Sequence, residues 1–296
     1  MRATRRRSGI GHLRGHVVVP WILVATFAVA DFLLPEGFAA PGWRAALREA
    51  GVVAEVGRLA GSRVGERVAR RGSRASYAGS VAPRDVDPVV LLPGFLAGDA
   101  SLAPLARALR AQGHRTYRSH IRANVGCTAR AAGQLEARLE AVVGRRGRRA
   151  TIVGHSLGGL VARGLAVRRP DLVAGIVTLG SPMLAPGAHH AALTRSLDAL
   201  VRLSRAGVPG LMALDCVAGD CARTSFDESR LPLPPDVWFT AVYSRRDGVV
   251  DWRACLDPLA RTVEVRSSHL GMVVDPAAIR EVCRVVAAGP APPSRP

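Results

Sequence analysis

The chain has 296 residues, of which 48% are apolar, which is enough for one large α/β domain with a full core or for two smaller ones. A formal net charge of +18 would ordinarily suggest nucleic-acid binding, but all 41 basic residues are arginine, whereas phosphate-binding proteins normally use lysine as well. The arginines are also spread along the whole chain, so we expect no nucleic-acid partner.

Residues 1–34 have the pattern of an export or anchoring segment. A basic stretch with five arginines precedes a nearly continuous apolar run from Val17 to Leu34. The run is either the core of a signal peptide, cleaved near Ala28-Val29-Ala30, or a single membrane anchor at the short end of the usual length. Both alternatives predict a secreted or cell-envelope protein, and the second adds membrane association through the N-terminus.

Residues 35–86 are expected to form a helical segment followed by a linker. Trp43, Leu47 and Val53 recur loosely at helical spacing, and arginines are frequent in the second half of the segment. We favour a solvated helix that packs an apolar stripe on the main domain over an amphipathic stalk at a membrane surface. The Gly, Ser and Pro content of residues 72–88 indicates the linker.

Residues 87–286 alternate between short apolar strands and helices. The expected strands cover residues 89–92, 114–118, 151–153, 175–183, 237–244 and 262–268. The expected helices start near Asp99 or Ser101 and run to about 112, and then cover 128–143, 157–167 and 277–286. This alternation predicts an α/β fold with a mostly parallel sheet and helices on both faces.

Residues 185–235 interrupt the alternation with a helical stretch at 191–204, a cysteine-containing loop and a proline-rich run. We expect a small cap over an active site, and the alternative is a surface excursion without a gating role. The Ala- and Pro-rich residues 287–296 are expected to be a disordered tail.

Five cysteines fit an exported protein. Cys216 and Cys221 are close enough in sequence to form a local disulfide, and the odd count leaves at least one cysteine unpaired. No CxxC pair and no histidine at zinc-ligand spacing accompanies them, so we expect no metal site.

The segment "TIVGHSLGGL" places Ser156 in a Gly-x-Ser-x-Gly pattern between a strand and a helix. At such a turn the serine backbone is strained, and Gly154 and Gly158 allow close chain crossings because they have no Cβ. The hydroxyl is then exposed above the carboxyl edge of the sheet, which makes Ser156 the candidate nucleophile.

A nucleophilic serine needs a histidine base and a carboxylate that orients it, and on this kind of fold the acid and then the histidine follow the serine in sequence. His269 is the histidine that follows Ser156 outside the expected cap, since His189 and His190 look like surface residues of that cap. Asp247 follows a strong apolar strand and is the preferred acid, with Asp251 as the alternative.

The oxyanion of the reaction needs two backbone N–H donors. Leu157, the first residue of the helix after the serine, supplies one. The loop "LLPGFL" after the first strand supplies the other, because Gly94 lets the backbone turn so that the N–H of Phe95 faces the site.

With these motifs the sequence resembles the α/β-hydrolase superfamily, and within it bacterial triacylglycerol lipases and related esterases. The resemblance spans about residues 87–286 and rests on "VVLLPGFLAGDASLAPLARALRAQGHRTY", "IVGHSLGGLVAR", "VTLGSPM", "YSRRDGVVDW" and "SSHLGM". It implies a triad of Ser156, Asp247 and His269, an oxyanion hole at Phe95 and Leu157, and an ester substrate. One departure is Pro93, because these lipases usually have histidine before the oxyanion-loop glycine.

The main hypothesis is therefore a serine hydrolase that cleaves carboxylic esters of lipid or acyl type. Acyl transfer to a lipid or glycan hydroxyl by the same triad and a non-catalytic, membrane-tethered scaffold are the two alternatives. No phosphate loop or dinucleotide loop occurs in the sequence, so we expect no cofactor.

Overall fold

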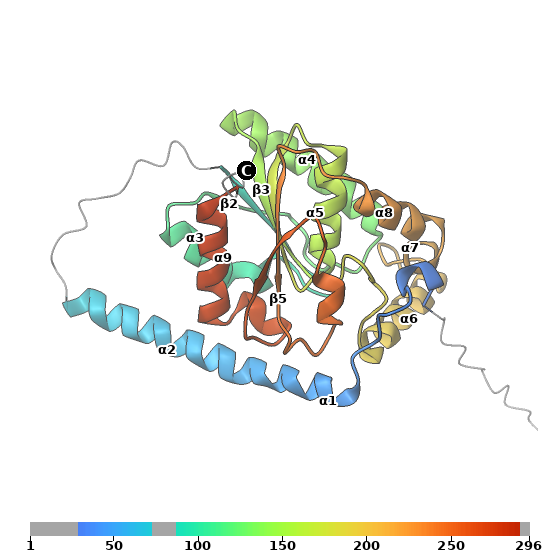
Figure 1. The fold of residues 1–296 in the computed structure, drawn as a ribbon, viewed down its shortest axis with the longest axis horizontal. Helices are drawn as coiled ribbons and strands as arrows, with labels where there is room; N and C mark the ends of the chain where they lie inside the picture. The colour runs from blue at the N-terminus through green and yellow to red at the C-terminus, as the bar shows by residue number, and fades with distance from the viewer. Residues whose placement is uncertain (1–28, 73–86, 291–296) are drawn as a thin grey trace, which may run out of the picture.

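The computed structural model describes residues 29–72 and 87–290 (Figure 1). Most of the expected export or anchor segment, most of the expected linker and the last six residues of the expected tail lie outside the described residues. Among the residues that are described, no helix combines the length and the apolar character needed to cross a bilayer.

In the described part of the chain, six strands form one parallel sheet in the order β2-β1-β3-β4-β5-β6. The strands are β1 (Val89–Leu92), β2 (Thr116–Arg118), β3 (Ala150–His155), β4 (Val173–Leu179), β5 (Trp238–Tyr243) and β6 (Arg261–Glu264). Each overlaps a strand expected from the sequence, and the predicted α/β class with a parallel sheet is confirmed.

Helices connect and cover the strands. The α-helices are α1 (Trp43–Ala46), α2 (Gly51–Gly72), α3 (Ala103–Ala111), α4 (Thr128–Arg146), α5 (Leu157–Arg168), α6 (Ala191–Arg205), α7 (Asp215–Ala218), α8 (Asp220–Arg230) and α9 (Pro276–Ala288). Short 3₁₀ turns are η1 (Asp31–Leu33), η2 (Leu47–Ala50), η3 (Asp99–Leu102), η4 (Trp252–Cys255) and η5 (Leu270–Val273).

Side chains on the two faces of the sheet belong to two separate hydrophobic layers. Along β1, Val89 and Leu91 join a layer that includes α3 and α9, whereas Val90 and Leu92 join a layer that includes α4 and α5. Successive side chains of a strand point to opposite faces, so the unbroken apolar run of β1 fits a strand covered on both sides. Figure 1 shows α3 and α9 on one side of the strands and α4 and α5 on the other.

The strand order reverses next to β1. The chain leaves β1 toward β2 at one edge and returns to β3 on the other side of β1. In open parallel sheets this reversal opens a crevice at the carboxyl ends of the strands, where ligands bind. The candidate nucleophile follows β3 and the candidate oxyanion loop follows β1, so both lie at this crevice.

The N-terminal segment, residues 35–72, packs on the domain through side chains other than those the sequence predicts. Trp43, Leu47 and Val53, expected in the buried stripe, are 66%, 63% and 76% exposed. The segment contacts the domain through Leu59, which packs on the hydrophobic layer of α3 and α9, and through charged side chains such as Glu55, which is only 4% exposed. The prediction of a packed apolar stripe is therefore wrong for Trp43, Leu47 and Val53. Figure 1 shows α2 running past α9 along one side of the domain.

Residues 185–235 contain α6, α7 and α8; α8 packs on α5, and α7 packs on α8 (Figure 1). The ring of Phe32 in η1 contacts that of Phe226 in α8 in a tilted arrangement, with the centroids 5.8 Å apart. Residues 29–34, which belong to the expected export segment, therefore pack on residues 185–235, hereafter the cap.

Candidate active site

Ser156 lies in a sharp turn between β3 and α5. Its backbone has φ +52° and ψ −122°, a conformation that non-glycine residues rarely adopt. A Cβ on Gly154 would lie 2.6 Å from backbone atoms of Gly158 and Gly159, and a Cβ on Gly158 would lie 2.4 Å from the carbonyl oxygen of Leu92. The two glycines of the motif are therefore required by close backbone packing, which holds the turn in its strained form.

Asp247 and His269 form a buried pair. The Nδ1 atom of His269 lies 2.7 Å from Oδ2 of Asp247, and each residue is 3% exposed. The other carboxylate oxygen, Oδ1, accepts 2.8 Å hydrogen bonds from the N–H groups of Val249 and Val250. Because both oxygens have partners, the carboxylate is fixed and directs Nε2 of His269 away from itself.

The Ser156 turn and the Asp247–His269 pair both lie at the end of β4. The N–H of Ser156 donates to the carbonyl of Leu179, the last residue of β4. A Cβ on the next residue, Gly180, would lie 3.0 Å from Nδ1 of His269 and 3.2 Å from Oδ2 of Asp247. Because Gly180 has no side chain, the Asp247–His269 pair has room to lie close to the serine turn.

Opposing effects act on the pKa of His269. Burial alone would lower the pKa, but the negative charge of Asp247, its hydrogen bond and the charge of Glu49 together raise it above the ordinary value. The surroundings therefore stabilise the protonated imidazolium, which is the form that a general base reaches after it has accepted a proton.

Asp251, the alternative acid, has other partners. Its carboxylate receives hydrogen bonds from the backbone and guanidinium of Arg253 and from the N–H of Ala39. Of the two candidates, it is Asp247 that the structure brings to His269.

Phe95 follows β1 and Leu157 follows β3, so the two residues lie on either side of the crevice at the carboxyl ends of these strands. A Cβ on Gly94 would lie 3.0 Å from Cβ of Ser156, so the loop after β1 is packed against the serine turn. In the part of the chain that the structure describes, the N–H groups of Phe95 and Leu157 donate to no other loop or side chain. Both donors are therefore available to a ligand.

Asn124 holds the oxyanion loop and was not identified from the sequence. Its side-chain amide donates 3.0 Å to the carbonyl of Pro93, and its backbone carbonyl accepts from the N–H of Leu96 at 3.0 Å. Asn124 is 3% exposed. The hydrogen bond from the Asn124 amide fixes the loop at Pro93, the position where the lipases that the sequence resembles usually have histidine.

Glu49 links the N-terminal segment to the loops that carry Asp247 and His269. Its Oε1 accepts from the N–H of Gly248 at 2.8 Å and from the N–H of His269 at 2.9 Å, and its Oε2 accepts from the N–H of Leu270 at 3.2 Å. One carboxylate therefore holds the residue after the acid and the histidine itself. A lone glutamate in a charged segment carries no sequence signal for such a role.

Glu55 makes a second link of the same kind. Its two oxygens accept from the N–H and the hydroxyl of Ser268 at 2.8 and 2.6 Å, and the Ser268 hydroxyl accepts from the N–H of Gly271. A Cβ on Gly271 would lie 2.0 Å from the Glu55 carboxylate. The loop that carries His269 is therefore built around this carboxylate.

His155, the residue before the nucleophile, supports His269 from its other side. Its Nε2 lies 3.0 Å from the carbonyl oxygen of His269, and the two ring centroids are 4.8 Å apart. Burial, followed by the charge of His269, lowers the pKa of His155 to about 3, so its ring is neutral at ordinary pH. A neutral ring in this position donates to the carbonyl and leaves the proton chemistry to His269.

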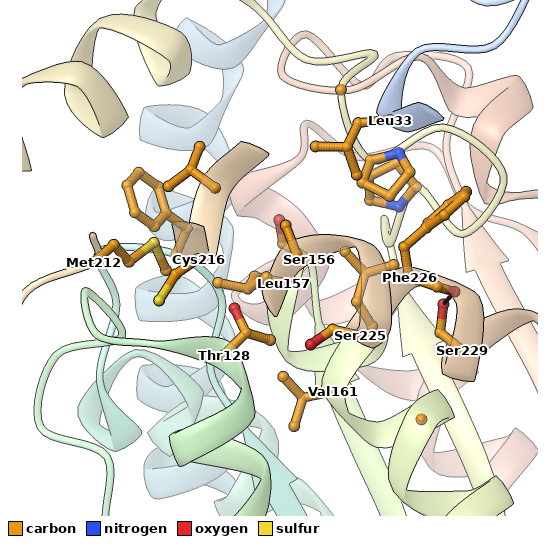
Figure 2. Close-up of a pocket in the computed structure, with 18 of the residues that line it drawn as sticks. Leu33, Thr128, Ser156, Leu157, Val161, Met212, Cys216, Ser225, Phe226 and Ser229 are labelled. Atoms are coloured by element: carbon orange, nitrogen blue, oxygen red, sulfur yellow. Dashed lines mark hydrogen bonds between the residues drawn. The ribbon is translucent and has the colours of Figure 1, made fainter. Parts of the chain in front are cut away.

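The crevice opens into an apolar pocket with a volume of about 160 Å³. Figure 2 shows Ser156 and Leu157 near its centre, with Met212 and Cys216 on one side and Phe226 on the other. Side chains from η1, α4, α5 and all three cap helices contribute to the lining. The pocket is thus a mainly hydrophobic chamber with the serine in its wall, as small-molecule sites usually are.

The prediction that both cap histidines are surface residues is wrong for His189. It is 8% exposed, lines the pocket, and its Nδ1 lies 2.8 Å from the carbonyl of Pro186. Burial lowers its pKa. His190 is half-buried and caps α6, where its Nδ1 accepts from the N–H of Ala192.

Comparisons with known proteins agree with this geometry. Residues 87–208 match the family model described as the alpha/beta hydrolase fold. The mature form of lipase BlEst2 from Bacillus licheniformis superposes with a TM-score of 0.55 at 13% identity, covering 72% of this chain and 96% of that one. Its propeptide form gives a TM-score of 0.55 at 13% identity, covering 75% of this chain and 54% of that one. No curated protein matches the chain significantly.

The protein has the α/β-hydrolase fold, with a serine turn and a buried Asp–His pair at the carboxyl edge of its sheet. The family model and the BlEst2 structures confirm the fold that the resemblance to α/β hydrolases implies. At 13% identity the structural likeness concerns the fold alone.

Proposed function

We propose that the protein is a serine hydrolase that cleaves carboxylic esters of lipid or acyl type through an acyl-enzyme. The observation that carries this proposal is the buried Asp247–His269 pair, which shares one sheet edge with the strained turn of Ser156, a residue that lines an apolar pocket. A nucleophile, a base and an orienting acid, in the chain order of this fold, are the parts that acyl transfer needs.

In the proposed mechanism, Ser156 attacks the ester carbonyl and His269 accepts the hydroxyl proton at Nε2. Nε2 is the available nitrogen because Nδ1 is bonded to Asp247 at 2.7 Å. Asp247 keeps the ring in this tautomer and stabilises the imidazolium. His269 then gives the proton to the departing alcohol oxygen as the tetrahedral intermediate collapses.

The N–H groups of Phe95 and Leu157 stabilise the negative oxygen of that intermediate. They come from fixed backbone on either side of Ser156, so they need little reorganisation when the charge develops. Water then attacks the acyl-enzyme, with His269 as base, and releases the carboxylic acid.

The apolar lining supports an acyl chain as the part of the substrate that enters the pocket. Leu157, Val161 and Leu165 lie on successive turns of α5 along its wall. The corresponding site of action is the cell envelope or the exterior, which the basic and apolar N-terminal sequence supports.

The test is a series of p-nitrophenyl esters from acetyl to long acyl, hydrolysed by the wild type and by Ser156→Ala. We expect the variant to lose at least about 10³-fold in kcat/KM on every ester, because the nucleophile is removed. Ser62→Ala, an exposed serine of α2, is the matched control and should keep wild-type rates. Wild-type rates in Ser156→Ala would refute the proposal.

Two further measurements separate the alternatives. If product analysis with an acceptor alcohol shows mainly a new ester and little free acid, the enzyme is an acyltransferase. If a fluorophosphonate fails to label Ser156 in the folded protein, the chain is a non-catalytic scaffold.

A further inference from the structure

Three cysteines that are far apart in the sequence come together beside the pocket. The Sγ atoms of Cys127, Cys216 and Cys221 all lie within 4.8 Å of one another. The Sγ atoms of Cys127 and Cys221 are 3.6 Å apart and in hydrogen-bond contact. Cys255 and Cys283 are buried elsewhere in the domain.

The cluster joins the sheet domain to the cap. Cys127 is the N-cap residue of α4, which packs on the sheet, whereas Cys216 lies in α7 and Cys221 in α8. The residues that directly follow Cys127 and Cys221, which are Thr128 and Ala222, both line the pocket. A covalent bond between Cys127 and Cys221 would therefore connect the α4 and α8 parts of the pocket wall.

Cys127 is the thiol best placed to start such a reaction. Burial acts to raise its pKa, but the N–H groups of Arg130 and Ala129 in the first turn of α4 and the two neighbouring thiols lower it overall. Burial and the proximity of Cys127 raise the pKa of Cys221 to about 12. Since the thiolate is the nucleophile, Cys127 reacts first and Cys221 second.

We propose that Cys127 and Cys221 form a disulfide that tethers the cap to the sheet domain, with Cys216 remaining as a free thiol. The Cys127 thiolate attacks a disulfide oxidant such as oxidised glutathione, forms a mixed disulfide and displaces one thiol of the oxidant. The sulfur of Cys221 then attacks the sulfur of Cys127 and displaces the second thiol. Two cysteine thiols lose two electrons and two protons in total, and the oxidant is reduced to two thiols.

This pairing differs from the local Cys216–Cys221 disulfide suggested by sequence spacing. A Cys127–Cys221 disulfide closes a loop between residues 94 positions apart, whereas a Cys216–Cys221 disulfide closes a very short loop. A cross-link over a long segment restricts the unfolded chain more strongly and stabilises the fold more.

The test uses the full chain equilibrated with oxidised and reduced glutathione, then alkylated, digested and mapped by mass spectrometry without reduction. We expect a Cys127–Cys221 linked peptide and three alkylated cysteines, because two of the five are oxidised. We also expect reduction to lower Tm by at least about 5 °C. Cys127→Ser and Cys221→Ser should lose this Tm shift, and the matched control Cys216→Ser should keep both the link and the shift.

Three results would overturn the proposal. They are a Cys216–Cys221 linked peptide as the main product, five alkylated cysteines after treatment with the oxidant, or one equivalent of zinc held by the three thiols in the elemental analysis. The assay measures linkage and Tm rather than ester cleavage, so its result is independent of the proposed function.

Discussion

At the scale of single residues, carboxylates far away in the sequence hold the loops of Asp247 and His269 in place. Glu49 precedes His269 by 220 residues, yet it accepts a hydrogen bond from the histidine backbone and one from Gly248 beside the acid. Its charge also contributes to the raised pKa of His269. We therefore regard Glu49 as a positioning residue, which acts on the reaction through His269 and Asp247.

Replacing Glu49 with glutamine should separate its charge from its geometry. The amide oxygen of glutamine can still accept from Gly248 and His269, but the negative charge is gone. The pKa of His269 should fall, and because the base must be neutral, the acid limb of the kcat/KM profile should move to lower pH.

Glu49→Ala removes the hydrogen bonds as well and should cost about 10-fold or more in kcat through misplacement of the triad. The measurement is a kcat/KM profile from pH 4 to 9 on one short ester for both variants. An unchanged acid limb in Glu49→Gln would show that the charge of Glu49 does not reach His269.

At the scale of elements, the N-terminal segment is bound to the domain by carboxylates that satisfy loop N–H groups. The sequence predicts apolar packing of this segment. The loops after β5 and β6 instead present backbone N–H groups to it, and buried N–H groups need hydrogen-bond acceptors. Glu55 is the most buried of these contacts, with two hydrogen bonds to Ser268.

We expect Glu55→Ala to lower the free energy of unfolding by about 2–3 kcal/mol, because it leaves the N–H and hydroxyl of Ser268 without their charged acceptor. Urea denaturation followed by circular dichroism measures this change. Glu36→Ala, which removes an exposed acid of the same segment, is the control and should leave the midpoint where it is. Equal effects of the two substitutions would contradict a structural role for Glu55.

Helix α5 forms a long wall of the pocket. Six of its residues line the pocket, from Leu157 to Arg168, a distance of about 16 Å at the usual helical rise. Val161 lies one turn beyond Leu157, and Figure 2 shows its side chain below Ser156 in the lining. A large side chain at this position should block the part of the pocket beyond the first turn.

Val161→Trp should lower the ratio of kcat/KM for decanoyl to acetyl esters by about 10-fold or more, because the longer chain loses its apolar contacts. Val161→Ala is the matched variant that enlarges the same position, and its ratio should stay equal or rise. The same ester series that tests Ser156 measures both ratios. A constant ratio in Val161→Trp would mean that the acyl chain does not follow α5.

At the scale of the whole molecule, the fold buries histidines in the neutral state and thereby couples stability to pH. The pKa of His155 is lowered to about 3 in the folded protein, and burial also lowers that of His189. A lowered histidine pKa means that the unfolded chain binds more protons between the two pKa values. Stability is then lost as the pH falls, whereas His269, with its raised pKa, contributes stability that is lost as the pH rises.

For His155 the loss extends from about pH 6.5 down to about pH 3, with a slope of up to about 1.4 kcal/mol per pH unit. His155→Asn should therefore flatten the dependence of the free energy of unfolding on pH between 4 and 6. Denaturation curves at several pH values measure the slope. His120→Asn, in an exposed turn with positive φ that asparagine tolerates, is the control; a slope as steep in His155→Asn as in this control would refute the coupling.

The sequence by itself determined the parallel sheet, the serine turn and the chain order of Ser156, an acid after β5 and His269. These features depend on short-range patterns, because apolar runs mark buried strands and glycines two residues either side of a serine mark a tight crossing. Strand ends in a parallel sheet meet at one edge, so the residues that follow them could be expected to gather there.

Only the tertiary structure decided between Asp247 and Asp251, joined Glu49 and Glu55 to the loops of Asp247 and His269, and brought Cys127 to the cap. Both aspartates follow β5, and which one reaches His269 depends on how the loop folds: Asp247 turns toward the histidine while Asp251 caps η4 and binds Arg253. A contact between residues 90 or more positions apart leaves no periodic pattern in the sequence around either residue. Such a contact depends on how two elements pack, and the local sequence of each element is compatible with many other neighbours.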